Sequence, residues 1–375
     1  VDGNEYIDYL MALGPIVLGY AYPATDEAVR RQLANGISFS LMHPLEVELA
    51  ELLTEIIPCA EMVRFGKNGS DVTSGAVRLS RAVTGREVIA AGGYHGWQDW
   101  FIGTTSRNRG VPKAVRELTK SFRYNHLEDL ERIFAEHRGQ VAAVILEPIH
   151  GEEPHEGFLQ QVADLTRQEG AILIFDEVKT GFRFGLGGAQ AHFGVTPDLA
   201  CFGKAIANGM PLSALVGLRD VMKELEEVFF SFTNGGETLS LAAAIATIQE
   251  MQREPVVEHI WREGKRLKDG FNEIARELEL ERMTHCYGLP PMTLVSFVDD
   301  NGKESIPLRS LFQQEVIRRG ILFDDGHFIC YSHSPEDIDE TLDAYREALM
   351  IVRSAAEAGD VAARLEGEMI RPIFQ

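Results

Sequence analysis

Two uninterrupted apolar runs, each followed by an acidic residue, constrain the fold of this chain more than any other feature. Residues 141–146 (VAAVIL) precede Glu147, and residues 171–175 (AILIF) precede Asp176. An apolar run of this length without alternation is typical of a strand that is buried on both faces. Because both faces are covered in the parallel sheets of α/β proteins, the two runs favour that fold class.

Amphipathic segments alternate with apolar runs along most of the chain. Apolar residues recur at helical spacing over residues 71–83, which predicts a helix there. The same periodicity predicts two further helices and three further strands: 126–137, 158–169, 88–91, 199–202 and 213–218. This order of elements predicts a mainly parallel central sheet with helices on both faces.

The order of elements changes after about Gly264. The elements expected downstream are a helix, a strand and two further helices: 265–280, 292–298, 308–319 and 335–348. We therefore interpret residues 41–264 as a large domain that carries the sheet and the ligand site, and residues 265–375 as a smaller α+β domain. Residues 1–40 are expected to form an N-terminal segment that packs with the smaller domain.

Charge and cysteine usage limit the class of partner. The 375 residues include 36 Lys and Arg against 57 Asp and Glu, a net charge of −21, so non-specific binding to nucleic acid or to an anionic membrane is not expected. No apolar run has the length needed to span a bilayer. The four cysteines have neither zinc nor redox-motif spacing, which favours a reduced, cytoplasmic setting: Cys59, Cys201, Cys286 and Cys330.

A metal site is one interpretation of the acidic segment between His150 and His155. Their i, i+5 spacing, with Pro154 between them, does not place both imidazoles on one face of a helix. A solvated loop explains these residues better, so no metal is expected.

Two segments could hold a phosphate and a planar ring. Residues 68–71 (NGSD) directly precede the helix expected over 71–83, and the free N–H groups of a first helical turn suit a phosphate. An ordinary N-cap with a glycine turn explains the same residues. Tyr94 follows the strand expected over 88–91 and could stack on a planar cofactor, although a core aromatic near a turn is an equal alternative.

An acid and a lysine follow two of the apolar strands. Asp176 would be costly to bury without a donor, which a protonated pyridine nitrogen or a structural ion pair would supply. Lys204 lies between Gly203 and Ala205 after the strand expected over 199–202. Desolvation there would lower its pKa and leave an amine able to form a Schiff base. A pyridoxal-phosphate enzyme requires this pair of groups.

In this order, the phosphate loop, aromatic residue, acid and lysine resemble those of the class III, or ω-, aminotransferases, which are fold-type I pyridoxal-phosphate enzymes. Within that family the chain is most similar to the glutamate-1-semialdehyde 2,1-aminomutase branch. The resemblance covers nearly the whole chain and rests on these segments: 14–23, 63–65, 94–96, 147–148, 176–183, 197–198, 203–211 and 233–236. It implies the fold-type I architecture and pyridoxal 5'-phosphate as cofactor.

The resemblance also implies roles for the residues around the cofactor ring. Lys204 would form the Schiff base and carry the proton between the substrate and the cofactor. Asp176 would pair with the pyridine nitrogen. Val178 would pack on one face of the ring and Tyr94 would stack on the other.

Further roles follow from the same resemblance. Gly69 and Ser70 would donate hydrogen bonds to the phosphate, and His95 and Glu147 would lie beside the cofactor. Thr233 matches a threonine that reaches the phosphate of the neighbouring subunit. The resemblance therefore implies a homodimer whose two active sites are shared between the subunits.

The implied reaction is the transfer of an amino group from an amino-acid donor to an aldehyde or ketone acceptor, through a pyridoxamine intermediate. The alternative is the intramolecular transfer carried out by glutamate-1-semialdehyde 2,1-aminomutase. The chain departs from the family pattern at Leu13, Lys179, Glu237 and residues 323–328, all in or beside the expected substrate pocket, which weakens that alternative. A cofactor-binding protein without catalysis would be expected to lack Lys204 or Asp176, so we expect an enzyme.

Overall fold

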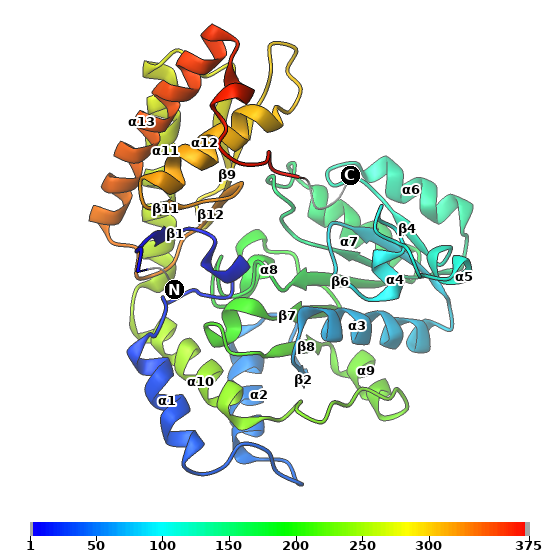
Figure 1. The fold of residues 1–375 in the computed structure, drawn as a ribbon. Coiled ribbons are helices and arrows are strands. Elements are labelled where there is room, and N and C mark those ends of the chain that lie inside the picture. The colour runs from blue at the N-terminus through cyan, green and yellow to red at the C-terminus, as the bar shows by residue number, and fades with distance from the viewer. Residues whose placement is uncertain (1–2, 372–375) are drawn as a thin grey trace. The chain divides into compact units, whose positions relative to one another are not determined.

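A seven-stranded sheet forms the centre of residues 20–254 in the computed structural model, which describes residues 3–371 (Figure 1). The strand order is β2-β8-β7-β6-β5-β3-β4. Only β8 runs antiparallel to its neighbours, and the other pairs are parallel. The predicted mainly parallel sheet is therefore confirmed. The strands are β2 (Met62–Gly66), β3 (Val88–Gly92), β4 (Thr119–Ser121), β5 (Val141–Leu146), β6 (Ile172–Glu177), β7 (Leu199–Phe202) and β8 (Ser213–Gly217).

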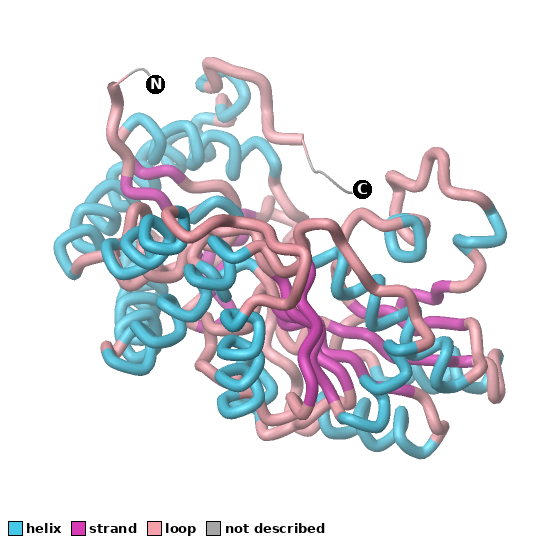
Figure 2. The backbone as a smooth tube through the Cα atoms, turned by 90° about the horizontal axis from the view of Figure 1, so that it is seen from below, coloured by secondary structure: helices cyan, strands magenta, loops and turns pink. Residues whose placement is uncertain are grey.

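Helices lie against this sheet, whose strands run side by side between them in Figure 2. Val72, Ala76 and Leu79 of α3 are fully buried in a cluster with side chains of β5, β6 and β8. Burial of this helical stripe explains why periodicity alone located the helix. The helices of this unit are α1 (Pro23–Leu33), α2 (Pro44–Ile56), α3 (Gly69–Thr84), α4 (Asp99–Ile102), α5 (Lys113–Arg116), α6 (Leu127–Glu136), α7 (Phe158–Gln168), α8 (Gly188–Phe193), η2 (Lys204–Ala207), α9 (Arg219–Met222), η3 (Lys223–Glu226) and α10 (Thr238–Arg253).

The strand register brings the carboxyl ends of four strands together. Gly92 of β3 pairs with Leu146 of β5, Leu146 pairs with Phe175 of β6, and Glu177 of β6 pairs with Phe202 of β7. Loops that follow these parallel strands therefore leave the sheet at one edge, where ligands bind in open α/β folds. The residues predicted for the ring and the lysine are all in these loops or at these strand ends.

Residues 3–19 and 255–371 form a second compact unit. In it, β1 pairs parallel with β11, and β12, β10 and β9 form an antiparallel sheet. A buried aromatic group, with Phe312 at its centre, fills the space between α11, α12, α13 and β10. The elements are β1 (Ile7–Asp8), η1 (Met11–Leu13), α11 (Val256–Glu277), β9 (Thr284–Leu289), β10 (Met292–Phe297), α12 (Ile306–Arg318), β11 (Ile321–Leu322), β12 (Gly326–Phe328), α13 (Pro335–Ala358) and η4 (Val361–Arg364).

The predicted start of the helix at residue 265 is wrong, because α11 begins at Val256 and continues through Gly264. A Cβ atom at residue 264 would lie 1.9 Å from the carbonyl oxygen of Pro290. Glycine is required at position 264 because the backbone of Pro290 passes so close to α11, and the helix continues through this residue. The domain limits expected at residues 40 and 264 stay a prediction.

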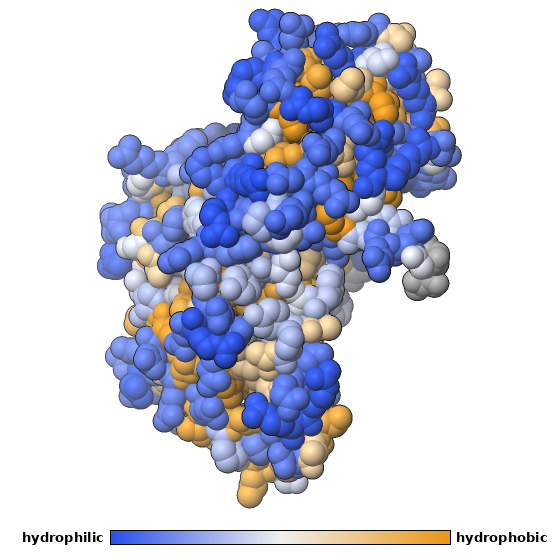
Figure 3. All heavy atoms as spheres, turned by 90° about the vertical axis from the view of Figure 1, so that its left-hand side faces the viewer, coloured by the Kyte–Doolittle hydropathy of each residue, from blue (hydrophilic) through white to orange (hydrophobic). Residues whose placement is uncertain are grey.

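Several large apolar side chains of the 20–254 unit are exposed. Leu41 is 85% exposed, Met42 68%, Val47 47% and Phe229 80%; we call these four residues the apolar rim. Hydrophobic side chains also reach the surface in the lower part of the face drawn in Figure 3. Within residues 3–371, no helix combines the length and the apolar character that crossing a membrane requires.

Candidate active site

Lys204 begins the short helix η2, two residues after β7 ends. Its backbone φ is +43°, a region that non-glycine residues seldom adopt and that is often found at functional sites. The pKa of Lys204 is lowered to about 8, mainly by burial and then by the charge of Lys179, while Glu147 and Asp176 oppose this shift. A larger share of this amine is therefore unprotonated near neutral pH than is usual for a lysine.

Asp176, near the end of β6, is buried against His95. Its Oδ2 atom lies 2.8 Å from Nδ1 of His95, and its Oδ1 atom accepts a hydrogen bond of 3.1 Å from the backbone N–H of Val178. The His95 ring is itself buried, and its Nε2 has no hydrogen-bond partner among the described residues. The Thr73 hydroxyl donates to the His95 carbonyl at 3.0 Å, so both the backbone and the ring of His95 are fixed.

Glu147, directly after β5, is 4% exposed and has three polar contacts. Its Oε1 lies 3.0 Å from Nζ of Lys179. Its Oε2 accepts a hydrogen bond of 2.9 Å from the backbone N–H of Tyr94 and lies 2.5 Å from Nδ1 of His150. Burial alone would raise the pKa of Glu147, but Lys179 and His150 hold it well below its ordinary value. The buried carboxylate is therefore charged.

Tyr94 and Val178 provide two apolar surfaces near these charges. Tyr94 is 47% exposed, and its ring is perpendicular to that of Phe101, with ring centroids 5.6 Å apart and an interplanar angle of 89°. Val178 is half-buried, and a Cβ atom added at Gly69 would lie 2.8 Å from its Cγ1. Val178 thus lies against the first residue of α3.

The first turn of α3 provides the candidate phosphate site. Gly69 and Ser70 are its first two residues, and α3 is 16 residues long, so its N-terminal N–H groups suit an anion. The Ser70 hydroxyl accepts a hydrogen bond of 3.3 Å from the backbone N–H of Trp97. A Cβ atom at Gly96 would lie 2.1 Å from the Ser70 hydroxyl, so only glycine lets the Tyr94 loop pass so close to this turn.

Thr233 lies apart from the other predicted site residues. It lies exposed in the turn before α10, and its side chain has no hydrogen bond within residues 3–371. Lys204, Asp176, Val178, Tyr94, His95, Glu147, Gly69 and Ser70 instead belong to one edge of the sheet.

The residues at this edge fit pyridoxal phosphate. A partly exposed aromatic ring and a branched aliphatic side chain suit the faces of a planar heterocycle. The buried Asp176 carboxylate suits its ring nitrogen, and the α3 turn suits its phosphate. The partly desolvated amine of Lys204 suits its aldehyde.

The comparisons with known proteins identify a family for the chain. The family model described as "Aminotransferase class-III" matches residues 1–333. The chain belongs to the class III aminotransferase family. This membership confirms the fold-type I architecture, the pyridoxal-phosphate cofactor and the aminotransferase activity that the resemblance implied.

Relatives within the family cover nearly the whole chain. A 3-aminobutyryl-CoA aminotransferase of Cloacimonas acidaminovorans is 38% identical over 94% of this chain and 86% of its own length. A glutamate-1-semialdehyde 2,1-aminomutase of Roseiflexus castenholzii is 37% identical, with coverages of 96% and 89%. The solved structure of the FumI protein of Sphingopyxis sp. MTA144, in its PLP internal aldimine form, has a TM-score of 0.89 at 28% identity, with coverages of 96% and 87%.

Two polar residues of the site were not predicted. The sequence marked Lys179 only as a departure from the family pattern, and it marked His150 only as a weak metal candidate. The structure places both against Glu147. His150 follows Glu147 in the same loop, but the pairing of Lys179 with Glu147 depends on the adjacency of β5 and β6, which the sequence order of the residues does not reveal. Within the described residues, no group of His, Cys, Asp and Glu side chains could hold a metal ion.

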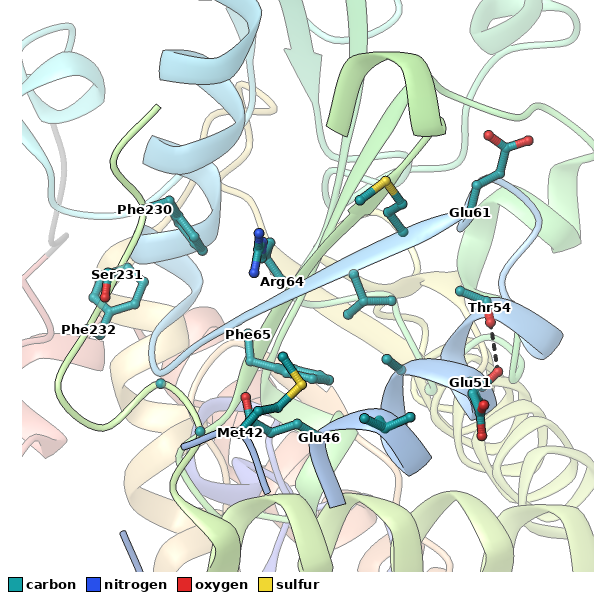
Figure 4. A pocket seen from close by; sticks show the side chains of 16 residues that line it. Met42, Glu46, Glu51, Thr54, Glu61, Arg64, Phe65, Phe230, Ser231 and Phe232 are labelled. Carbon is teal, nitrogen blue, oxygen red and sulfur yellow. Dashed lines mark hydrogen bonds between the residues drawn. The ribbon is translucent and has the colours of Figure 1, made fainter. Parts of the chain in front are cut away.

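A pocket of about 450 Å³ lies elsewhere on the 20–254 unit, between α2, β2 and the 230–236 segment (Figure 4). Met42, Phe65 and Phe232 give it apolar walls, and Glu46 and Arg64 add charge. It contains none of the predicted cofactor residues. Two residues of the apolar rim, Met42 and Val47, line it.

Proposed function

We propose that the aminotransferase reaction takes place at the carboxyl edge of the seven-stranded sheet, with Lys204 as the lysine that binds the cofactor. The observation that carries this proposal is the half-buried Lys204 amine, with its pKa lowered to about 8, in the field of Asp176 and Glu147. When bound, pyridoxal phosphate supplies an electron-withdrawing ring that stabilises negative charge on the substrate carbon. Lys204, as an uncharged amine, would take the proton from that carbon and hold it on Nζ, from which it could be returned.

Asp176 holds a proton on the ring nitrogen in this proposal. A buried carboxylate beside that nitrogen favours its protonated form. The hydrogen bond between Nδ1 of His95 and Oδ2 of Asp176 keeps the carboxylate in place. Tyr94 and Val178 bind opposite faces of the ring, and Gly69 and Ser70 bind the phosphate.

The proposed substrates are an amino-acid donor and an aldehyde or ketone acceptor. The Cloacimonas relative is named as an aminotransferase of an amino acyl-CoA compound, which supports transfer between two molecules. The Roseiflexus relative, named as a 2,1-aminomutase and 37% identical, keeps intramolecular transfer as the second candidate. The departures at Lys179 and Glu237 favour the first.

We also propose a cytoplasmic homodimer with shared active sites. Thr233 is exposed on the same loop as Phe229 of the apolar rim. Met42 and Val47 of the apolar rim line one pocket with Phe230, the residue after Phe229. Exposed apolar side chains that gather in this way often mark an interface, and a second copy related by a two-fold axis would cover them and bring Thr233 to the partner's phosphate. All four cysteines are free and buried, as expected in a reducing compartment.

The visible absorption of the protein with pyridoxal phosphate, before and after addition of glutamate, tests this function. We expect a yellow band that bleaches to a stable form as glutamate donates its amino group. A band that does not respond to glutamate or to other amino donors would favour the aminomutase. Absence of the band would contradict the proposed site.

A further inference from the structure

Two bridges join the two segments that face the proposed ring, residues 93–96 and 176–179. In the first, His95 contacts Asp176 directly at 2.8 Å. In the second, the Lys179 ammonium binds Oε1 of Glu147 at 3.0 Å, and Oε2 of Glu147 accepts the N–H of Tyr94 at 2.9 Å. The segment carrying Val178 is therefore tied at both ends to the segment carrying Tyr94.

The second bridge depends on the charge of Lys179. The Glu147 side chain is 5% exposed, whereas that of Lys179 is 24% exposed. A buried carboxylate that loses its cation becomes an uncompensated charge, which is strongly destabilising. His150, with a side chain 43% exposed, also contacts Glu147 but binds the oxygen that already accepts from Tyr94. Lys179 therefore binds Oε1 of Glu147, whereas His150 binds Oε2. If Lys179 is removed, His150 cannot take its place at Oε1.

We propose that Lys179 is a positioning residue for the cofactor: through Glu147 it holds the Tyr94 backbone in place opposite Val178, and so sets the gap that the ring enters. This inference rests on the proposed function, in which the ring lies between Tyr94 and Val178. Glycine at position 93 leaves room for the bridge, because a Cβ atom there would lie 2.6 Å from Oε2 of Glu147.

The same ammonium acts on Lys204. The charged groups that affect Lys204 are Lys179, Glu147, Asp176 and Arg183, and the histidines that affect Glu147 are His150 and His95. Without Lys179, the larger of the two positive charges that lower the pKa of Lys204 is lost, and only Arg183 remains. The negative charge of Glu147 is then less compensated, which also raises that pKa. Both changes raise the pKa of Lys204.

The test compares Lys179→Met with Lys179→Arg, using Lys113→Met as a control. Lys113 is an exposed lysine whose Nζ lies 3.4 Å from Glu117. For each variant we would measure the Kd for pyridoxal phosphate and the pH midpoint of the rate at which the apoprotein binds the cofactor covalently, which reports the pKa of the Lys204 amine. Lys179→Met should weaken cofactor binding roughly tenfold or more and raise the midpoint by about one pH unit. Lys179→Arg should restore most of both, and Lys113→Met should change neither.

Other outcomes are equally decisive. An unchanged Kd and midpoint in Lys179→Met would overturn the inference, and so would a variant in which only the KM for the substrate rises, because Lys179 would then be a substrate contact. If Lys179→Met does not fold, Lys179→Gln takes its place, because glutamine keeps a hydrogen bond without the charge. A pH midpoint of Lys179→Gln equal to that of the wild type would overturn the inference. A wild-type protein without a yellow band would count against the proposed function instead.

Discussion

At the scale of single residues, the site depends on charges that are buried beside one another. Lys204 is half-buried near a second lysine, Lys179, and near two carboxylates, Glu147 and Asp176. Desolvation and the positive charges of Lys179 and Arg183 together lower the pKa of Lys204 more than the two acids raise it. The proposed reactive amine of Lys204 is therefore partly unprotonated, although two carboxylates lie close enough to affect it by their charge.

This balance predicts how the apoenzyme takes up its cofactor. The uncharged amine is the form that attacks an aldehyde, and its fraction rises as the pH increases through the pKa. The rate at which pyridoxal phosphate binds covalently should therefore rise with pH and level off above a midpoint near 8. Stopped-flow absorption measures this rate, and Lys204→Ala provides the baseline. A midpoint near 10.5, the ordinary lysine value, would contradict the account.

The individual residues differed in how far the sequence could predict them. Lys204 and Asp176 follow apolar strands, so their position at the sheet edge followed from the pattern alone. The bridge from Lys179 to Glu147 joins residues that lie far apart in the sequence, in the loops that follow β6 and β5. Its existence depends on side-chain geometry at the sheet edge, which no local pattern encodes.

At the scale of elements, the close approach of α3 to Val178 sets the phosphate end of the site. The Cβ atom of an alanine at residue 69 would lie 2.8 Å from Cγ1 of Val178, closer than real side chains come, so Val178 would have to move. Gly69→Ala should weaken pyridoxal-phosphate binding by about tenfold, equivalent to about 1.4 kcal/mol, with little change in overall stability.

Gly185→Ala is the matched control for this change. A Cβ atom at residue 185 meets nothing within 4 Å, and Gly185 follows the same β6 strand as Val178. Equilibrium titration with cofactor measures the effect. Equal affinity of the two variants would show that Val178 does not border the cofactor.

The sequence located some elements to the residue and missed others. β5 and β7 match the expected ranges because fully buried strands are apolar throughout. α10 was not predicted: its N-cap is Glu237, whose side chain accepts from the N–H of Leu239 at 2.6 Å, and glutamate is not one of the residues that usually mark a helix start. β9 was also missed, and α11, which begins at Val256, was predicted to start too late, at residue 265.

At the scale of the whole molecule, the apolar rim bears on assembly. Phe229→Asp would place a charge in the proposed interface, where it would lose its hydration. We expect this variant to have the mass of one chain, 41.7 kDa, in light scattering, whereas the wild type should have twice that mass. Its affinity for pyridoxal phosphate should also fall, because Thr233 would no longer reach a partner.

Met350→Asp controls for the added charge, since Met350 is 55% exposed but lies on α13, outside the apolar rim. It should leave the mass and the cofactor affinity unchanged. A Phe229→Asp variant that remains a dimer with normal affinity would show that the interface lies elsewhere. A wild type with the mass of one chain would contradict the proposed dimer altogether.

The most direct test of the central claim is to identify the lysine that binds the cofactor. The protein loaded with pyridoxal phosphate would be reduced with borohydride, digested, and mapped by mass spectrometry for the peptide that carries the cofactor-derived mass. We predict the modification at Lys204 and its loss in Lys204→Ala. Modification at Lys179, or persistence of the label in Lys204→Ala, would contradict the account.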